Sequence, residues 1–121
     1  MNGIHPNGKA TFTAGEAIAK GEFVKFSNGK VVKCAAATDI AIGVALDGAE
    51  SGAIVPVQLL TSGDTVLVKA GGAVAQGGTL SCLGTTVATA GALQYGIALN
   101  AAANGELVEA AVGLPAVTKI A

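Results

Sequence analysis

Glycine interrupts this sequence so often that ordinary helices have little room to form. The chain has 18 glycines among 121 residues. From residue 10 onward they separate short apolar runs at intervals of about 6 to 12 residues. Short apolar runs joined by glycine turns are typical of β-sandwiches and β-barrels. We therefore predict an all-β chain that forms a small barrel-like or sandwich-like domain.

The runs richest in β-branched residues give the expected strands. They cover residues 23–26, 31–34, 40–46, 54–60, 65–70, 79–83, 86–89, 95–99 and 107–112. Asn28-Gly29 lies between the first two runs and supplies the positive φ angles of a tight hairpin, either as a two-residue turn or as a three-residue turn with a glycine bulge. Pro56 cannot donate a hydrogen bond to a neighbouring strand, so it predicts an edge strand or a bulge.

An internal repeat divides the sequence into two related parts. Three blocks of the first part recur in the same order in the second: 14–21 as 70–77, 43–46 as 96–99, and 52–55 as 105–108. The offset falls from 56 (70 − 14) to 53 (96 − 43), which indicates a shorter hairpin region in the second copy. We infer two related β-units, at about 14–60 and 70–112. Because a unit of about 45 residues cannot bury its apolar face alone, we expect both to pack into one β domain spanning 14–121.

The composition excludes several classes of protein. Hydrophobic residues make up 51% of the chain, charged residues 12% and aromatic residues 3%, and the mean hydropathy is +0.61. Such a chain is too apolar to be disordered, and it fits a subunit that hides part of its surface. The net charge is −1, and all seven basic residues are lysines. A nucleic-acid partner is therefore not expected, since binding needs a basic field and favours arginine.

No segment of the sequence predicts membrane insertion or secretion. The most apolar stretch, residues 87–103, is interrupted by polar and turn-forming residues, whereas a spanning helix needs about 20 mainly apolar residues. The first 12 residues contain no apolar core of a signal peptide. We expect synthesis in a cytoplasm and no membrane partner.

Reactive side chains are few and scattered. His5 is the only histidine, and it lies in a polar, turn-rich segment, residues 1–13, that we expect to form an extended N-terminal arm. Cys34 and Cys82 are 48 positions apart (82 − 34) and form no Cys-x-x-Cys motif, so small buried thiols are favoured over a disulfide or a metal site. Asp39 and similar carboxylates lie near turns, where they commonly make local hydrogen bonds.

Two further motifs lack the residues that phosphate binding or cofactor attachment would require. Residues 71–78 are glycine-rich but lack the Gly-Lys-Ser/Thr end of a phosphate-binding loop. Lys69 precedes a glycine turn as a carrier lysine would, but the sequence around it lacks the lipoyl or biotin attachment motif. We therefore predict a protein that is not an enzyme and that needs no cofactor and no metal.

Three segments resemble a known family, the small capsid decoration (cement) proteins of tailed bacteriophages. They are residues 14–26, 42–46 and 54–57, and the resemblance extends over roughly 14–112. It implies a compact β domain on the capsid exterior of the virion, which binds after the shell expands and clamps neighbouring subunits of the major capsid protein. Many members are trimers and some are dimers, so a homotrimer is expected, with a dimer as the alternative.

The same resemblance implies a use for the N-terminal arm, because cement proteins often extend such an arm over the shell. Ile4, His5, Pro6 and Phe12 are the arm residues able to anchor, and so they are the candidate capsid contacts. Phe12 fits the start of the first core strand equally well. The alternative function is a non-catalytic β binding module, for carbohydrate or host-surface adhesion, displayed on a particle. One tyrosine and three phenylalanines are a small supply of rings for such a site.

Overall fold

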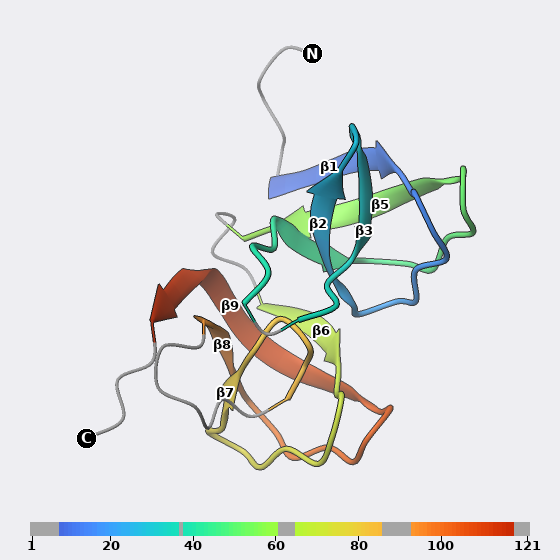
Figure 1. Cartoon of the computed structure of the whole chain (residues 1–121). Helices are drawn as coiled ribbons and strands as arrows, with labels where there is room; N and C mark the ends of the chain where they lie inside the picture. The colour runs from blue at the N-terminus through green and yellow to red at the C-terminus, as the bar shows by residue number, and fades with distance from the viewer. Residues whose placement is uncertain (1–7, 37, 61–64, 86–92, 118–121) are drawn as a thin grey trace.

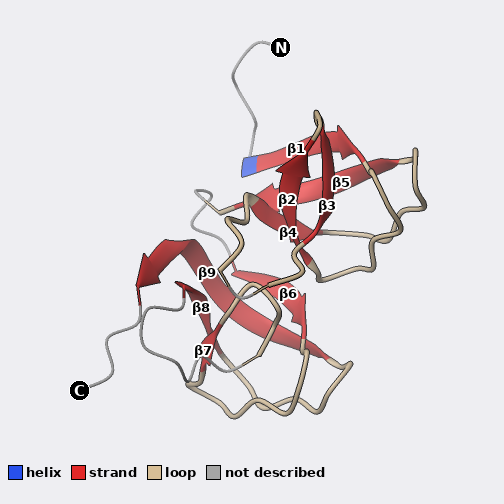
Figure 2. Ribbon diagram, viewed as in Figure 1, coloured by secondary structure: helices blue, strands red, loops and turns tan. Residues whose placement is uncertain are grey.

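A computed structural model describes residues 8–36, 38–60, 65–85 and 93–117, and it confirms the all-β prediction. The described residues form two antiparallel sheets and no helix of regular length (Figure 2). The strands are β1 Lys9–Thr13, β2 Phe23–Ser27, β3 Lys30–Lys33, β4 Gly43–Ala45, β5 Ile54–Leu59, β6 Thr65–Lys69, β7 Thr79–Leu80, β8 Leu93–Ala98 and β9 Leu107–Val117.

The two sheets have the same strand order apart from one strand. The first sheet has the order β1-β5-β4-β2-β3 and the second has the order β6-β9-β8-β7. Figure 1 shows the first sheet, coloured blue to green, beside the second, coloured yellow-green to red. Strands β1, β5, β4 and β2 therefore correspond in order to β6, β9, β8 and β7. No strand of the second sheet corresponds to β3 among the described residues.

Hydrogen bonds outside the strands follow the sequence repeat. The bridge between Ile18 and Ala49 has its counterpart between Val74 and Ala102. Three hydrogen bonds of the first half each have a counterpart in the second. Ala14 N donates to Ala53 O as Ala70 N donates to Glu106 O (both 2.8 Å), and Ile18 N donates to Ala49 O (2.8 Å) as Val74 N donates to Ala102 O (2.9 Å). Likewise, Gly21 N donates to Ala45 O (2.9 Å) as Gly77 N donates to Ala98 O (2.8 Å). The repeated sequence thus produces a repeated backbone path, in which a loop folds back over one face of each sheet.

The hairpin between β2 and β3 has a two-residue turn. Ser27 pairs with Lys30, so only Asn28 and Gly29 lie between the strands. Their φ angles are +51° and +78°. Two consecutive positive φ angles in a two-residue loop define the type I′ turn, whose twist matches that of the flanking strands. The alternative with a glycine bulge is therefore wrong.

The expectation that Pro56 marks an edge strand or a bulge is wrong. Its strand, β5, lies between β1 and β4 and pairs regularly with both. Pro56 O accepts a hydrogen bond of 2.8 Å from Leu46 N, just beyond the end of β4. Since the proline cannot return that hydrogen bond, regular pairing with β4 stops there. An interior strand tolerates the proline because its nitrogen faces the place where the neighbouring strand has ended.

The first strand begins earlier than the sequence predicts. The arm was expected to reach residue 13, yet β1 pairs with β5 from Lys9↔Gln58 to Thr13↔Ile54. Ala10 is buried and Phe12 packs against an apolar cluster of the first sheet. Polar residues alternate with these two side chains, which is the pattern of a strand with one buried face.

Other strands also differ in length from the expected ones. The expected strand 40–46 is reduced to β4, and 79–83 is reduced to β7, whereas β9 runs to Val117. The expected strand at 86–89 lies outside the described residues. The amide of Ala41 donates to the hydroxyl of a tyrosine of the other sheet, described below, whereas Ile42 N still donates to Val24 O and Ile42 O accepts from Leu60 N.

Two apolar clusters form the core. One belongs to the first sheet alone and contains Ala14, Ile18, Val24, Val31, Ala45, Val55 and Val57. The other joins both sheets: Phe23, Cys34, Ala41, Val44 and Leu60 come from the first part of the chain, and Val66, Val68, Leu80, Tyr95 and Val108 are among the members from the second. The core of the second sheet is thus completed by side chains of the first.

Gly21 provides a test of how closely the two sheets approach. It has φ +88°, and a Cβ added there would lie 2.6 Å from Lys69 N and 2.8 Å from Leu107 Cδ2. Its counterpart Gly77 has a similar φ of +84°, but a Cβ added there would have no atom within 4 Å. We expect Gly77→Ala to lower the free energy of unfolding by about 1–2 kcal/mol, for the backbone alone. Gly21→Ala should cost roughly 1–3 kcal/mol more, because the junction is overpacked. Urea unfolding of both variants measures the difference, and equal losses would contradict the close approach.

Candidate functional site

The residues predicted to touch a capsid are divided by the structure. Ile4, His5 and Pro6 lie outside the described residues. Phe12 lies in β1, half-buried, and its ring meets that of Phe26 edge to face with centroids 5.4 Å apart at 83°. Phe12 therefore contributes to the packing of the first sheet, and Phe26 is the ring of this pair that faces solvent, with 57% of its surface exposed.

Potential metal ligands are dispersed over the part of the chain that the structure describes. No three His, Cys, Asp or Glu side chains are grouped there so that they could hold a metal ion. Nor does any described helix have the length and hydropathy needed to cross a membrane. Cys34 and Cys82 are free thiols and both are buried, which confirms the interpretation of the two cysteines as small core residues.

Tyr95 is the main polar link between the two sheets. Its ring is 2% exposed and lies against Phe23, with centroids 5.4 Å apart. Its hydroxyl donates a hydrogen bond of 2.8 Å to Asp39 O and accepts one of 2.9 Å from Ala41 N. Burial raises the pKa of Tyr95 above its ordinary value of 10. The ring thus fills the shared core while its hydroxyl satisfies two backbone groups of the other half of the chain.

Asp39 holds together the loop that Tyr95 contacts. One carboxylate oxygen accepts hydrogen bonds from Ala35 N (2.8 Å) and Ala36 N (2.9 Å) and lies 2.9 Å from Lys25 Nζ. The Lys25 ammonium and then these two amides lower the pKa of Asp39 from its ordinary 3.8 to about 2. The same ion pair raises the pKa of Lys25. This carboxylate therefore does structural work at the junction and is not a candidate general base at neutral pH.

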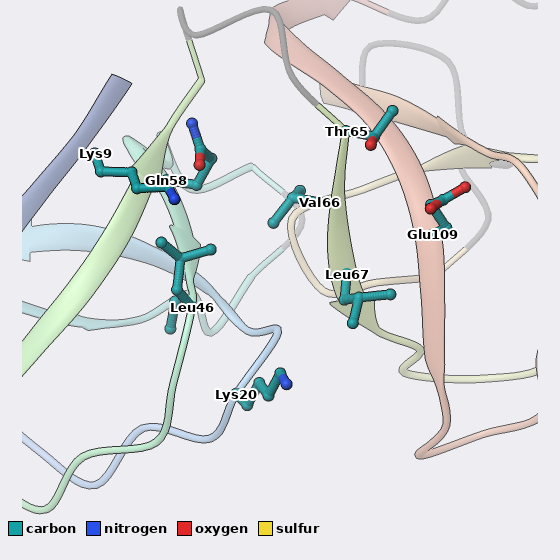
Figure 3. A pocket seen from close by; sticks show the side chains of 9 residues that line it. Lys9, Lys20, Leu46, Gln58, Thr65, Val66, Leu67 and Glu109 are labelled. Carbon is teal, nitrogen blue, oxygen red and sulfur yellow. The ribbon is translucent and has the colours of Figure 1, made fainter. Parts of the chain in front are cut away.

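An open cavity of about 540 Å³ lies between the two sheets. Figure 3 shows Lys9, Lys20, Leu46 and Gln58 on the side of the first sheet and Thr65, Val66, Leu67 and Glu109 on the side of the second. Two amines and one carboxylate line it beside apolar side chains. The lining therefore combines charged and apolar side chains from both sheets.

The second sheet exposes several apolar side chains on one face, beside charged ones. Half of the large exposed hydrophobic residues in the described part of the chain are on it or at its border: Leu67, Ile97, Leu99 and Leu107. Strand register places Leu67 opposite Glu109, and Ile97 opposite Ala111. Leu99 N donates to Glu109 O (2.8 Å), which places Leu99 beside the same strand. We call these side chains, with Glu109 and Ala111, the outer face of the second sheet.

The matching face of the first sheet is covered around Val44 and Gln58 but exposed at Ile54, which corresponds to Leu107. Ile97 corresponds in the repeat to Val44, and Ala111 corresponds to Gln58. Val44 is 0% exposed and Gln58 is 3% exposed, whereas Ile97 is 48% exposed. Val44 is buried in the cluster that contains Val66 and Val68 of the second sheet. The same position of the repeat is therefore an internal interface in one copy and free surface in the other. Sequence reasoning missed this face, since exposure cannot be read from two equally apolar strands.

Comparison with known proteins gives a family and a fold. A family model described as phage cement protein matches residues 4–114. Among solved structures, the head fiber gp8.5 N base of bacteriophage phi29 is similar, with a TM-score of 0.68 and 21% sequence identity over 87% of this chain and 92% of that chain. At this identity, the likeness shows a shared fold. No curated protein matches the sequence.

The junction also predicts a specific acid sensitivity. Because the folded-state pKa of Asp39 is lowered, the charged carboxylate stabilises the fold above about pH 4, and this contribution is lost as the pH falls from 3.8 toward 2. We expect Asp39→Asn to flatten the dependence of the free energy of unfolding on pH in this window. Lys25→Met should flatten it less, because the two amide hydrogen bonds remain. Urea unfolding between pH 2 and pH 5 measures both, and an Asp39→Asn variant as acid-sensitive as the parent would contradict the assignment.

Proposed function

The chain belongs to the phage cement protein family, and on this premise we propose that it binds the outer surface of a phage capsid and clamps neighbouring subunits of the major capsid protein. As a member it is a structural protein of the virion, associated with the capsid. The observation that best supports clamping is the uncovered apolar face of the second sheet, since monomeric proteins rarely leave such a face exposed. Clamping needs apolar area and shape and no reactive group, so the proposed protein is not an enzyme.

We propose that a second copy of the chain covers the outer face of the second sheet. Within one chain, Val44 on the matching face of the first sheet packs in one cluster with Val66 and Val68 of β6. The repeat equates β6 with β1, the free edge strand of the first sheet. In the proposed contact, β1 of one copy approaches the outer face of the next copy. Such a contact joins unlike surfaces, and it forms a closed ring when the rotation between copies permits. A homotrimer is the proposed ring.

An oligomer also explains how weak contacts with a shell become a stable clamp. Each copy brings one N-terminal segment, and linked copies raise the effective concentration of the others once the first has bound. Ile4, His5 and Pro6 remain the proposed shell contacts, whereas Phe12 acts by anchoring β1 in the sheet from which that segment extends.

The aromatic residues give little support to a carbohydrate-binding module. Sugar-binding sites usually present exposed rings, yet Tyr95 and Phe23 are each 2% exposed and Phe12 is half-buried. Phe26 is the exposed ring of the four that the chain contains. A single ring at the end of a hairpin is a weaker basis for function than the outer face of the second sheet.

Co-sedimentation with phage shells tests the clamping proposal. The intact protein should sediment with expanded shells of the parent phage and raise the temperature at which they break. Deleting residues 1–7 should weaken binding at least tenfold while leaving the far-ultraviolet circular dichroism spectrum unchanged, because β1 begins at Lys9. A protein that ignores expanded shells at every concentration would refute the proposal, and binding unaffected by the deletion would refute the role of the N-terminal segment.

Light scattering tests the self-association surface separately. We expect the parent protein to have the mass of an oligomer and Ile97→Lys to have that of a monomer, because a charge at the centre of the buried contact would lose its hydration. Ile40→Lys is the matched control: Ile40 is more exposed (65% against 48%) and lies away from the outer face, so this variant should remain oligomeric. A monomeric parent, or an Ile97→Lys variant that stays assembled, would contradict this surface.

A further inference from the structure

The two cysteines meet at the junction of the two sheets. Cys34 follows β3 in the first part of the chain, and Cys82 lies in the turn after β7 in the second. They are 8% and 3% exposed and belong to the same apolar cluster. Both also line one cavity of about 180 Å³, together with Lys33 and Lys69. The fold has thus brought together two thiols that are 48 positions apart (82 − 34) in the sequence.

Backbone hydrogen bonds fix the segments that carry the two thiols. Cys34 N donates to Phe23 O at 3.0 Å, which ties Cys34 to the start of β2. Cys82 Sγ donates to Ala36 O at 3.0 Å, so the thiol of the second part already reaches the loop that follows Cys34. The turn around Cys82 is itself closed by a hydrogen bond of 3.0 Å from Gly84 N to Ser81 O. Hydrogen bonds therefore hold both of the segments that carry the thiols in place.

The two thiols influence each other's ionisation. A hydrogen bond with Cys82 and burial raise the pKa of Cys34, whereas the hydrogen bond with Cys34 lowers the pKa of Cys82. Cys82 is therefore the first of the pair to become a thiolate, which is the reactive form in thiol–disulfide exchange. Both cysteines line the shared cavity.

We propose that Cys34 and Cys82 are a modification site: in an oxidising environment they form an intramolecular disulfide that fastens the two sheets together. Disulfides persist on the surfaces of virus particles and are rare in the reducing cytosol. The setting rests on the proposed function, since only a protein of the released particle meets such conditions. The chemistry of the pair does not rest on it and is testable on the isolated protein.

The reaction needs one oxidant, and a low-molecular-weight disulfide such as oxidised glutathione supplies it. The Cys82 thiolate attacks one sulfur of the reagent, forms a mixed disulfide and releases one glutathione thiolate. The Cys34 thiol loses its proton to solvent, and the resulting thiolate attacks the Cys82 sulfur and releases the second glutathione. Two protein thiols are oxidised and one glutathione disulfide is reduced to two thiols. The sulfurs must approach to about 2.05 Å, by rotation of the two side chains.

Mass spectrometry of the purified protein tests the proposal directly. After equilibration with oxidised glutathione, the chain should lose two hydrogens, about 2 Da, and should take up no iodoacetamide when unfolded, whereas the reduced chain takes up two alkyl groups. Peptide mapping should join the segments containing Cys34 and Cys82. The cross-link closes a long loop, so the oxidised monomer should melt roughly 10 °C higher than the reduced one.

Variants separate this bond from other effects of the oxidant. The double variant Cys34→Ala, Cys82→Ala should melt at the same temperature with and without the oxidant, and each single variant should gain one glutathione. Two thiols that stay fully alkylatable, or bonds found only between chains, would overturn the proposal. Shell binding by the reduced protein is measured in parallel. Shell binding by a protein whose thiols stay alkylatable after oxidation refutes only this inference, and a disulfide in a protein that does not bind shells refutes only the proposed function.

Discussion

The second sheet of this protein cannot complete its core without side chains from the first. Each half of the chain has only about 45–50 residues, which is close to the size at which a single domain stops burying enough surface to be stable. One apolar cluster, around Val24, Val55 and Val57, is formed by the first sheet alone. The core of the second is shared, and Phe23, Ala41 and Val44 of the first half complete it. Tyr95 then satisfies buried backbone groups across the same junction.

The two halves differ in how completely each builds its own core, and the repeat explains this difference. The offset between matched blocks falls from 56 to 53, and the second sheet has no described counterpart of β3. In the first half, Val31 of β3 completes the apolar cluster of the first sheet. In the second half, the turn around Cys82 occupies the corresponding part of the chain, with Gly71 N bonded to Gly84 O where Gly15 N is bonded to Val31 O. The described part of the second unit contains no such strand, and side chains of the first half complete its core.

The sequence predicts the class of fold and the repeat, because both depend on local signals. Glycine spacing predicts the turns, and Asn28-Gly29 predicts the hairpin. Pro56 misled the prediction because the rule for proline considers one strand, whereas its tolerance depends on where β4 ends. Ala41 looked like part of a strand, yet its amide donates to the hydroxyl of Tyr95, more than 50 positions away. The exposure of Ile97 was likewise hidden, since Val44 and Ile97 are equivalent in sequence and differ only in what covers them.

In this repeat, the same position is covered in one copy and exposed in the other. An assembly that covers the exposed position would join unlike surfaces and would therefore have a direction. The covered face shows what kind of surface fits it: an edge strand of the other half, packed over Val44 beside Gln58. In the proposed ring, the free face meets the equivalent edge of another chain, so the angle between the two sheets would set the angle between successive copies. That angle is fixed at the junction, by the Phe23–Tyr95 contact, the close approach at Gly21 and the pair Cys34–Cys82. A bond between these sulfurs would therefore stiffen the whole assembly by acting on one hinge within each copy.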